Sequence, residues 1–387
     1  MKENSHSNNK YFEPIWLNLY RVNILPTDET EKCPSTDLSH YRSNMMNNQY
    51  SRSARFTLYS WIVVAAIAYS LPSVAQNAGT YSAPRTVDDV PDLQGVWTNN
   101  TITSLTRPER FGNQLVLTAE EAFELEKEVA DYNSGRDLPS DPDREAPVKD
   151  RIETADSYNN FWMDTGTQVI VYNNEFRSSI IVDPPNGQVP DYTVQARARI
   201  DAATEQRRSG GAFDGPESRP LPERCLMSFG SSSGPPMLPI LYNNHYQIVQ
   251  SPGYLMILVE MVHDARIIRI DDQPLTENMK RWMGDSIGHW EGNTLVVETT
   301  QFNSLQRFRG SSENLKVTER FTRVADDVIN YAFTIEDPET FTQSWSGEMP
   351  LNRTESRLYE YACHEGNYSL GGVLAGARLA ENEEATR

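Results

Sequence analysis

The chain has 387 residues, enough for one large domain or two ordinary ones, and its composition can build a hydrophobic core. Its formal net charge of -19 at pH 7 argues against nucleic acid as a partner, because phosphates would be repelled. The same charge disfavours binding to an anionic membrane surface. Acidity also keeps a protein in solution, so the charge alone indicates no particular function.

An apolar run at residues 58–76 predicts a secretory signal peptide. Arg52 and Arg55 precede the run, and small residues end it at Ala75. The run is too short for a comfortable transmembrane helix. We therefore expect a leader over residues 1–75 and a secreted or periplasmic protein with no stable membrane span after cleavage.

The position of this apolar run is unusual, because it starts some distance from the first residue. Met45 and Met46 stand just before its basic flank, and we expect translation to begin at one of them. The alternative is a signal anchor with a short cytoplasmic tail. Cleavage fits the length of the run and its small-residue ending better.

The region 76–237 is expected to be a mixed extended and helical region that packs on a barrel. Residues 118–133 predict a helix, with Thr118 and Glu121 as a capping box, and residues 193–208 predict a second helix capped by Thr193. The expected strands of this region are 92–100, 167–172 and 178–185.

From residue 238 onward the sequence becomes rich in β-branched and aromatic residues with short joins. The expected strands are 245–250, 254–262, 265–270, 293–302, 314–324, 328–337, 341–349 and 357–364. Their spacing predicts a mainly β fold, in which an antiparallel meander over 238–370 closes into a barrel. A β-sandwich is the alternative, and 371–387 is expected to be an acidic tail.

Two cysteines remain once the leader, which contains Cys33, is removed. An even pair in an oxidising compartment predicts a disulfide between Cys225 and Cys363. Adjacent strand residues point to opposite faces, so Cys363 and His364 are not expected to act as a nucleophile and its base.

Strand alternation places several charged side chains on apolar faces. Glu319 lies between Val317 and Phe321 in the pattern, and Asp337 ends another apolar stripe. Glu260 and His263 extend the two faces of the strand 254–262. Burying a carboxylate is costly unless the group is paired or protonated. Each carboxylate is therefore expected either to pair with an arginine or to serve a ligand site; the candidate partners are Arg266, Arg269 and Arg309.

Candidate site residues follow from this pattern. Glu319, His263 and His364 are the candidate catalytic acids and bases. The candidate ligand-binding residues are Glu260, Glu365, Asp337, Trp290 and Tyr361. The histidines show no metal-binding spacing, so no metal site and no cofactor are predicted.

Four segments carry a resemblance to known proteins: "RWMGDSIGHWEGNTLVVETTQFN" (281–303), "RGSSENLKVTERFTR" (309–323), "YEYACHEGNY" (359–368) and "FDGPESRPLPERC" (213–225). In these segments the chain resembles a family of uncharacterised secreted bacterial proteins. The resemblance implies export but no activity. The β-rich half is also similar to lipocalin-like barrels, a likeness that carries no function by itself.

Three functions compete at this point. The first is an exported protein that binds a small, partly apolar molecule in a barrel cavity. The second is a cofactor-free lyase, isomerase or hydrolase that uses a buried glutamate and a histidine. The third is a structural or interaction module of the cell envelope. A cavity lined by carboxylate and histidine would favour the enzyme, an apolar cavity the binding protein, and a filled core the module.

Overall fold

The computed structural model describes residues 81–136, 163–209, 211–228, 234–276, 278–305 and 308–386. All of them lie in one compact unit that runs from Thr80 to Arg387. The predicted leader, 1–75, lies outside the described residues. Among the described helices, none is both long enough and apolar enough to cross a membrane.

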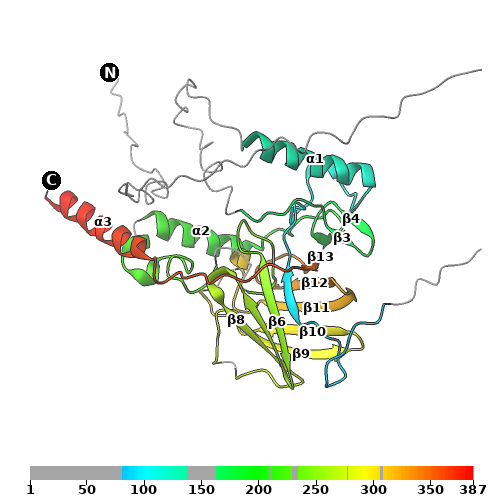
Figure 1. The fold of residues 1–387 in the computed structure, drawn as a ribbon. Coiled ribbons are helices and arrows are strands. Elements are labelled where there is room, and N and C mark those ends of the chain that lie inside the picture. Colours follow the sequence, from blue (N-terminus) through cyan, green and yellow to red (C-terminus); the bar gives the residue numbers. More distant parts are fainter. Residues whose placement is uncertain are drawn as a thin grey trace, which may run out of the picture. The chain divides into compact units, whose positions relative to one another are not determined.

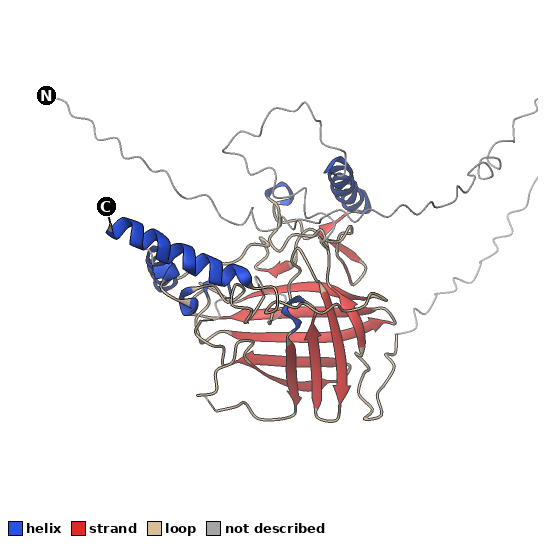
Figure 2. Cartoon of the chain, turned by 60° about the vertical axis from the view of Figure 1, so that its left-hand side comes forward, coloured by secondary structure: helices blue, strands red, loops and turns tan. Residues whose placement is uncertain are grey.

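The predicted barrel is confirmed (Figures 1 and 2). Nine strands form one continuous sheet, and the first strand pairs with both the second and the last, which closes it. The strands are β1 (Gly95–Thr98), β6 (His245–Ser251), β7 (Tyr254–Val259), β8 (Ala265–Ile270), β9 (Asp285–Glu291), β10 (Thr294–Thr300), β11 (Lys316–Ala325), β12 (Val328–Glu336) and β13 (Trp345–Arg353). Because the sheet closes on itself, most of its strands have no edge with unpaired backbone groups.

Alternating side chains fill the barrel interior. In β11, Val317, Glu319 and Phe321 are buried and the residues between them are more exposed, as strand periodicity predicts. Aromatic rings dominate the packing, including Trp97 and Trp345, neither of which has measurable exposure. The interior is therefore a packed core, to which every barrel strand except β9 contributes a buried apolar side chain.

The barrel differs from the predicted meander in three ways, the first of which is the additional strand β9. Strands β8 and β9 are parallel, so their connection crosses from one end of the barrel to the other. The predicted strand 357–364 is wrong, because these residues form no strand. β1 closes the barrel in its place, through pairs such as Trp97 with Arg353.

A short buried segment outside the strands packs against the barrel core. Residues 234–238 are all buried, and the amide nitrogen of Met237 donates a hydrogen bond of 2.9 Å to the hydroxyl of Tyr331. The carbonyl of Met237 accepts a hydrogen bond of 3.3 Å from Asn99 Nδ2. This segment, which we call the plug, ties the barrel interior to the chain outside it.

The N-terminal region adds the two predicted helices and a small sheet. Helix α1 (Ala119–Arg136) begins at the predicted capping box, where the Glu121 amide donates to Thr118 Oγ1 at 3.2 Å and the Thr118 amide donates to Glu121 Oε2 at 2.8 Å. Strands β2 (Val116–Leu117), β4 (Glu175–Arg177) and β3 (Val171–Tyr172) form the small sheet.

Two further elements join this region to the barrel. Strand β5 (Ile181–Asp183) pairs with β13. Helix α2 (Val194–Arg208) begins after the predicted cap Thr193, which accepts a hydrogen bond of 3.1 Å from the Ala196 amide. Arg199 of α2 donates to the carbonyl of Gly310 at 2.9 Å, so the helix lies against the loop before β11.

The chain after β13 forms a strap, residues 354–367, followed by helix α3 (Tyr368–Ala385). The prediction of an acidic tail over 371–387 missed this helix. The strap is held by the amide of Thr354, which donates to Val96 at 3.0 Å, and by the predicted disulfide between Cys225 and Cys363, whose Cα atoms are 5.7 Å apart.

Candidate functional site

Glu319 lies in the middle of the barrel core with no exposed surface. Both carboxylate oxygens accept hydrogen bonds from Arg266 of β8, one of them from Nη1 at 3.0 Å. The hydroxyl of Tyr331 donates to the same carboxylate at 2.9 Å. The predicted pairing with an arginine is thus present, and it lies wholly inside the core.

The rest of the Arg266 guanidinium is also satisfied inside the barrel. Its Nε donates to Ser286 at 3.1 Å, and Nη2 donates to Thr299 at 3.0 Å. Burial raises the pKa of Tyr331 well above its ordinary value, so its hydroxyl keeps its proton. The network links β8, β9, β10, β11 and β12, and its geometry is that of a structural tie across the barrel.

The buried Glu260 forms a second pair, with the half-buried His245. Glu260 Oε2 lies 2.9 Å from His245 Nδ1, and the amide of Tyr359 in the strap donates to Oε1 at 3.0 Å. The hydrogen bond to Glu260 raises the pKa of His245. Burial opposes ionisation of Glu260, but the hydrogen bonds from His245 and Tyr359 outweigh it and lower the pKa of that carboxyl.

Asp337 is buried and organises the loop before β11. Its carboxylate accepts hydrogen bonds from the amide of Ser312 at 2.7 Å and from the Ser312 hydroxyl at 3.0 Å. Its own carbonyl accepts from the amides of Thr340 and Phe341. These contacts give Asp337 a turn-forming role.

The remaining candidates do not gather around Glu319. His263, His364 and Glu365 are exposed, while Trp290 and Tyr361 are half-buried against the barrel core. Within the described part of the chain, no hydrogen bond or ion pair joins either of these histidines to Glu319. Nor do three or more described His, Cys, Asp or Glu residues gather as a metal ion would require.

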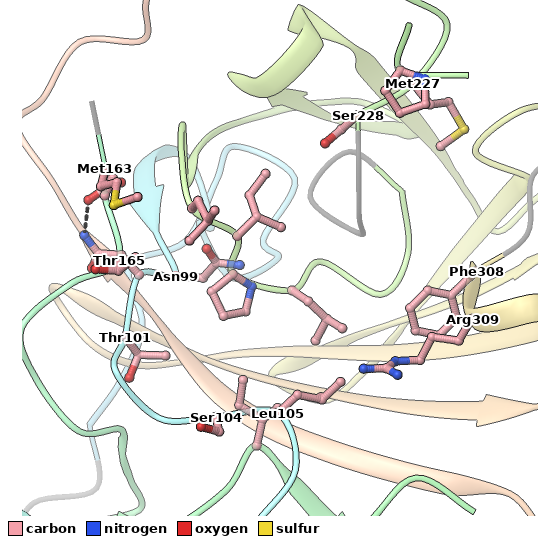
Figure 3. A pocket seen from close by; sticks show the side chains of 18 of the residues that line it. Asn99, Thr101, Ser104, Leu105, Met163, Thr165, Met227, Ser228, Phe308 and Arg309 are labelled. Carbon is pink, nitrogen blue, oxygen red and sulfur yellow. Dashed lines mark hydrogen bonds between the residues drawn. The ribbon is translucent and has the colours of Figure 1, made fainter. Parts of the chain in front are cut away.

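A large groove lies outside the barrel core, beside the plug (Figure 3). Its volume is about 2330 Å³. Its lining comes from parts of the chain that are distant in sequence: residues 99–105, 163–171, 211–212, 217–222, 224, 227–228, 238–241, 305 and 308–310, with additional residues from α1, α2 and the end of β13. Apolar side chains such as Leu105 and Phe308 share the lining with polar groups.

The buried Asn99 and the half-buried Asp164 mark the wall of the groove. Asn99 Nδ2 donates to the Tyr246 hydroxyl at 3.1 Å, while its Oδ1 accepts no hydrogen bond from any described residue. Asp164 Oδ1 accepts from Asn100 at 2.7 Å, and its Oδ2 lies 3.8 Å from His245 Nδ1. The groove thus reaches from the plug to Asp164, which links its wall to His245.

The lining carries more arginines than acids. The arginines of the lining are Arg207, Arg219, Arg224 and Arg309, and its acidic residues are Asp164 and Glu217. Sequence reasoning missed this site because its residues come from separate loops and follow no local pattern. Arg309 entered the predictions only as a partner for a buried carboxylate, and among the described residues it pairs with none.

Comparison of the chain with protein-family models, with curated proteins and with solved structures gave no match. The fold and the groove are therefore interpreted from their own geometry. The class they define is a closed β-barrel with a packed interior, an inter-segment disulfide and a groove beside the plug.

Proposed function

We propose that the protein is an exported binding protein that holds a small, partly apolar molecule in the groove beside the plug. Export is inferred from the predicted signal peptide and from the disulfide, which is typical of an oxidising compartment. The site differs from the one expected from the sequence, because the barrel interior is filled and the groove lies outside it.

The groove itself is the observation that carries the proposal. Ligand sites are usually concave and mainly apolar, contain a few polar groups, and span about 300–1,000 Å³. The groove exceeds that range and combines apolar side chains with the unpartnered oxygen of Asn99. Such a lining suits an amphipathic molecule better than a fully polar one.

The two alternatives have less support. The enzyme that uses Glu319 requires this carboxylate to meet substrate, but both of its oxygens are bound by Arg266 in the core. The filled barrel is what a structural module of the envelope would show. A structural module would not need the groove. A ligand-binding experiment therefore decides between a binding protein and a structural module.

Titration with Nile red, an uncharged apolar fluorophore, tests the proposal. We expect saturable binding to the mature protein. Leu241 lines the groove and is 46% exposed, whereas Leu379 of α3 lies outside the groove and is 61% exposed. Leu241→Asp and Leu379→Asp are therefore matched variants at exposed positions.

The proposal predicts that Leu241→Asp weakens Nile red binding about tenfold, because a charge replaces apolar contact surface. Leu379→Asp should bind like the unmodified protein. Absence of saturable binding, or equal loss in both variants, would contradict the proposal and favour the structural module.

A further inference from the structure

We infer that the molecule bound in the groove is an amphipathic carboxylate and that Arg309 receives its charged end. This inference rests on the proposed function and specifies the chemical class of the ligand. It starts from a contrast in charge: the chain carries -19 overall, yet four arginines and only two acidic residues line the groove.

These arginines differ in whether they form an ion pair with an acidic residue. Arg219 is occupied, because Glu223 accepts from its Nε at 2.7 Å and from its Nη2 at 2.9 Å. Arg207, Arg224 and Arg309 form no ion pair with any residue in the described ranges. Unpaired cations in a strongly acidic chain are the groups most available to an anionic ligand.

Arg309 is held in an unusual backbone conformation. Its φ of 48° lies in the left-handed region, which residues with a side chain seldom occupy. The neighbours fix this conformation: Phe308 is buried and stacks on Trp345 with ring centroids 6.0 Å apart, and the Gly310 carbonyl accepts from Arg199 at 2.9 Å. Residues held in such conformations by their surroundings are often functional.

The result is an exposed cation beside the apolar side chains of the groove. Figure 3 shows the Arg309 side chain extending from its turn toward the side chains that line the groove, with Leu105 among them. A guanidinium binds a carboxylate through two parallel hydrogen bonds, and apolar surface beside it can take a hydrocarbon chain. An acid with an apolar body matches both features, whereas an organic cation would be repelled by Arg309.

Displacement of Nile red by decanoate and by decanol tests the inference, because the two compounds share a hydrocarbon chain and differ in charge. We expect decanoate to displace Nile red from the unmodified protein about tenfold more effectively than decanol. Arg309→Gln should remove this preference by weakening decanoate alone, and Arg309→Lys should retain part of it. The preference should also fall as salt is raised.

Arg357→Gln is the matched control. Arg357 is an exposed arginine outside the groove lining, without an ion pair to any described residue. This variant should keep the full preference for decanoate. Equal displacement by the two compounds, or equal weakening of both by Arg309→Gln, would overturn the inference while leaving Nile red binding intact. Failure of Nile red to bind at all would instead refute the proposed function.

Discussion

Replacing Glu319 by Gln tests whether the Arg266 network is a structural tie. The substitution keeps the shape of the side chain but removes its charge and turns one acceptor oxygen into an amide donor. Arg266, only 3% exposed, then loses its counterion and at least one charge-assisted hydrogen bond. Such a bond contributes about 1.5–3 kcal/mol, and leaving a buried charge unpaired costs about 3–5 kcal/mol in total.

Denaturant melts of the single and double variants measure this effect. We expect Glu319→Gln to lower the free energy of unfolding by about 3–5 kcal/mol, and Arg266→Met added to it to recover part of that loss. Recovery is expected because the double variant leaves no buried charge unpaired. Unchanged stability in Glu319→Gln would refute the structural role and return Glu319 to the candidates for a ligand site.

Three other predictions concern the disulfide, the His245 pair and the leader. Cys225→Ser should lower the free energy of unfolding by up to about 5 kcal/mol, since the bond to Cys363 closes a loop with a sequence separation of 138; thiol labelling that finds both cysteines free in the unreduced mature protein would contradict the bond. The raised pKa of His245 means that its pairing with Glu260 stabilises the fold below about pH 6.5 and that this contribution is lost as pH rises through the folded-state pKa. The melting-temperature loss in His245→Gln should therefore be larger at about pH 5.5 than at about pH 8.5, and an equal loss at both would count against the shift. Intact-mass measurement of the exported protein should place its first residue near Gln76, whereas a mass that retains residues 1–75 would show that no cleavage occurs.

Much of the barrel was predictable because its strands alternate cleanly. The faces of the strand around Glu319 follow from Val317 and Phe321, and the burial of the carboxylate was correctly expected. Strand β9 was missed because Asp285–Glu291 is mostly polar and contains a glycine. That glycine has a packing reason: a Cβ at Gly288 would lie 2.8 Å from Ile270 Cδ1.

The closing strand was mispredicted for a topological reason. Residues 357–364 are aromatic and alternate like a strand, but β1 already occupies the place between β6 and β13. The pairing of β1 with β6 and β13 joins residues that are far apart in the chain. Such a pairing leaves no local pattern in the sequence. The groove was missed for the same reason, because Asn99, Leu105 and Arg309 come to line one groove only in the folded chain.

The location of the ligand is the central claim, and methionine methyl resonances test it most directly. Met163 and Met227 line the groove, whereas Met261 and Met349 are buried in the barrel core. With ¹³C-methyl methionine, titration with decanoate should shift the resonances of Met163 and Met227 and leave those of Met261 and Met349 in place. Shifts confined to Met261 and Met349 would place the ligand inside the barrel and contradict the account.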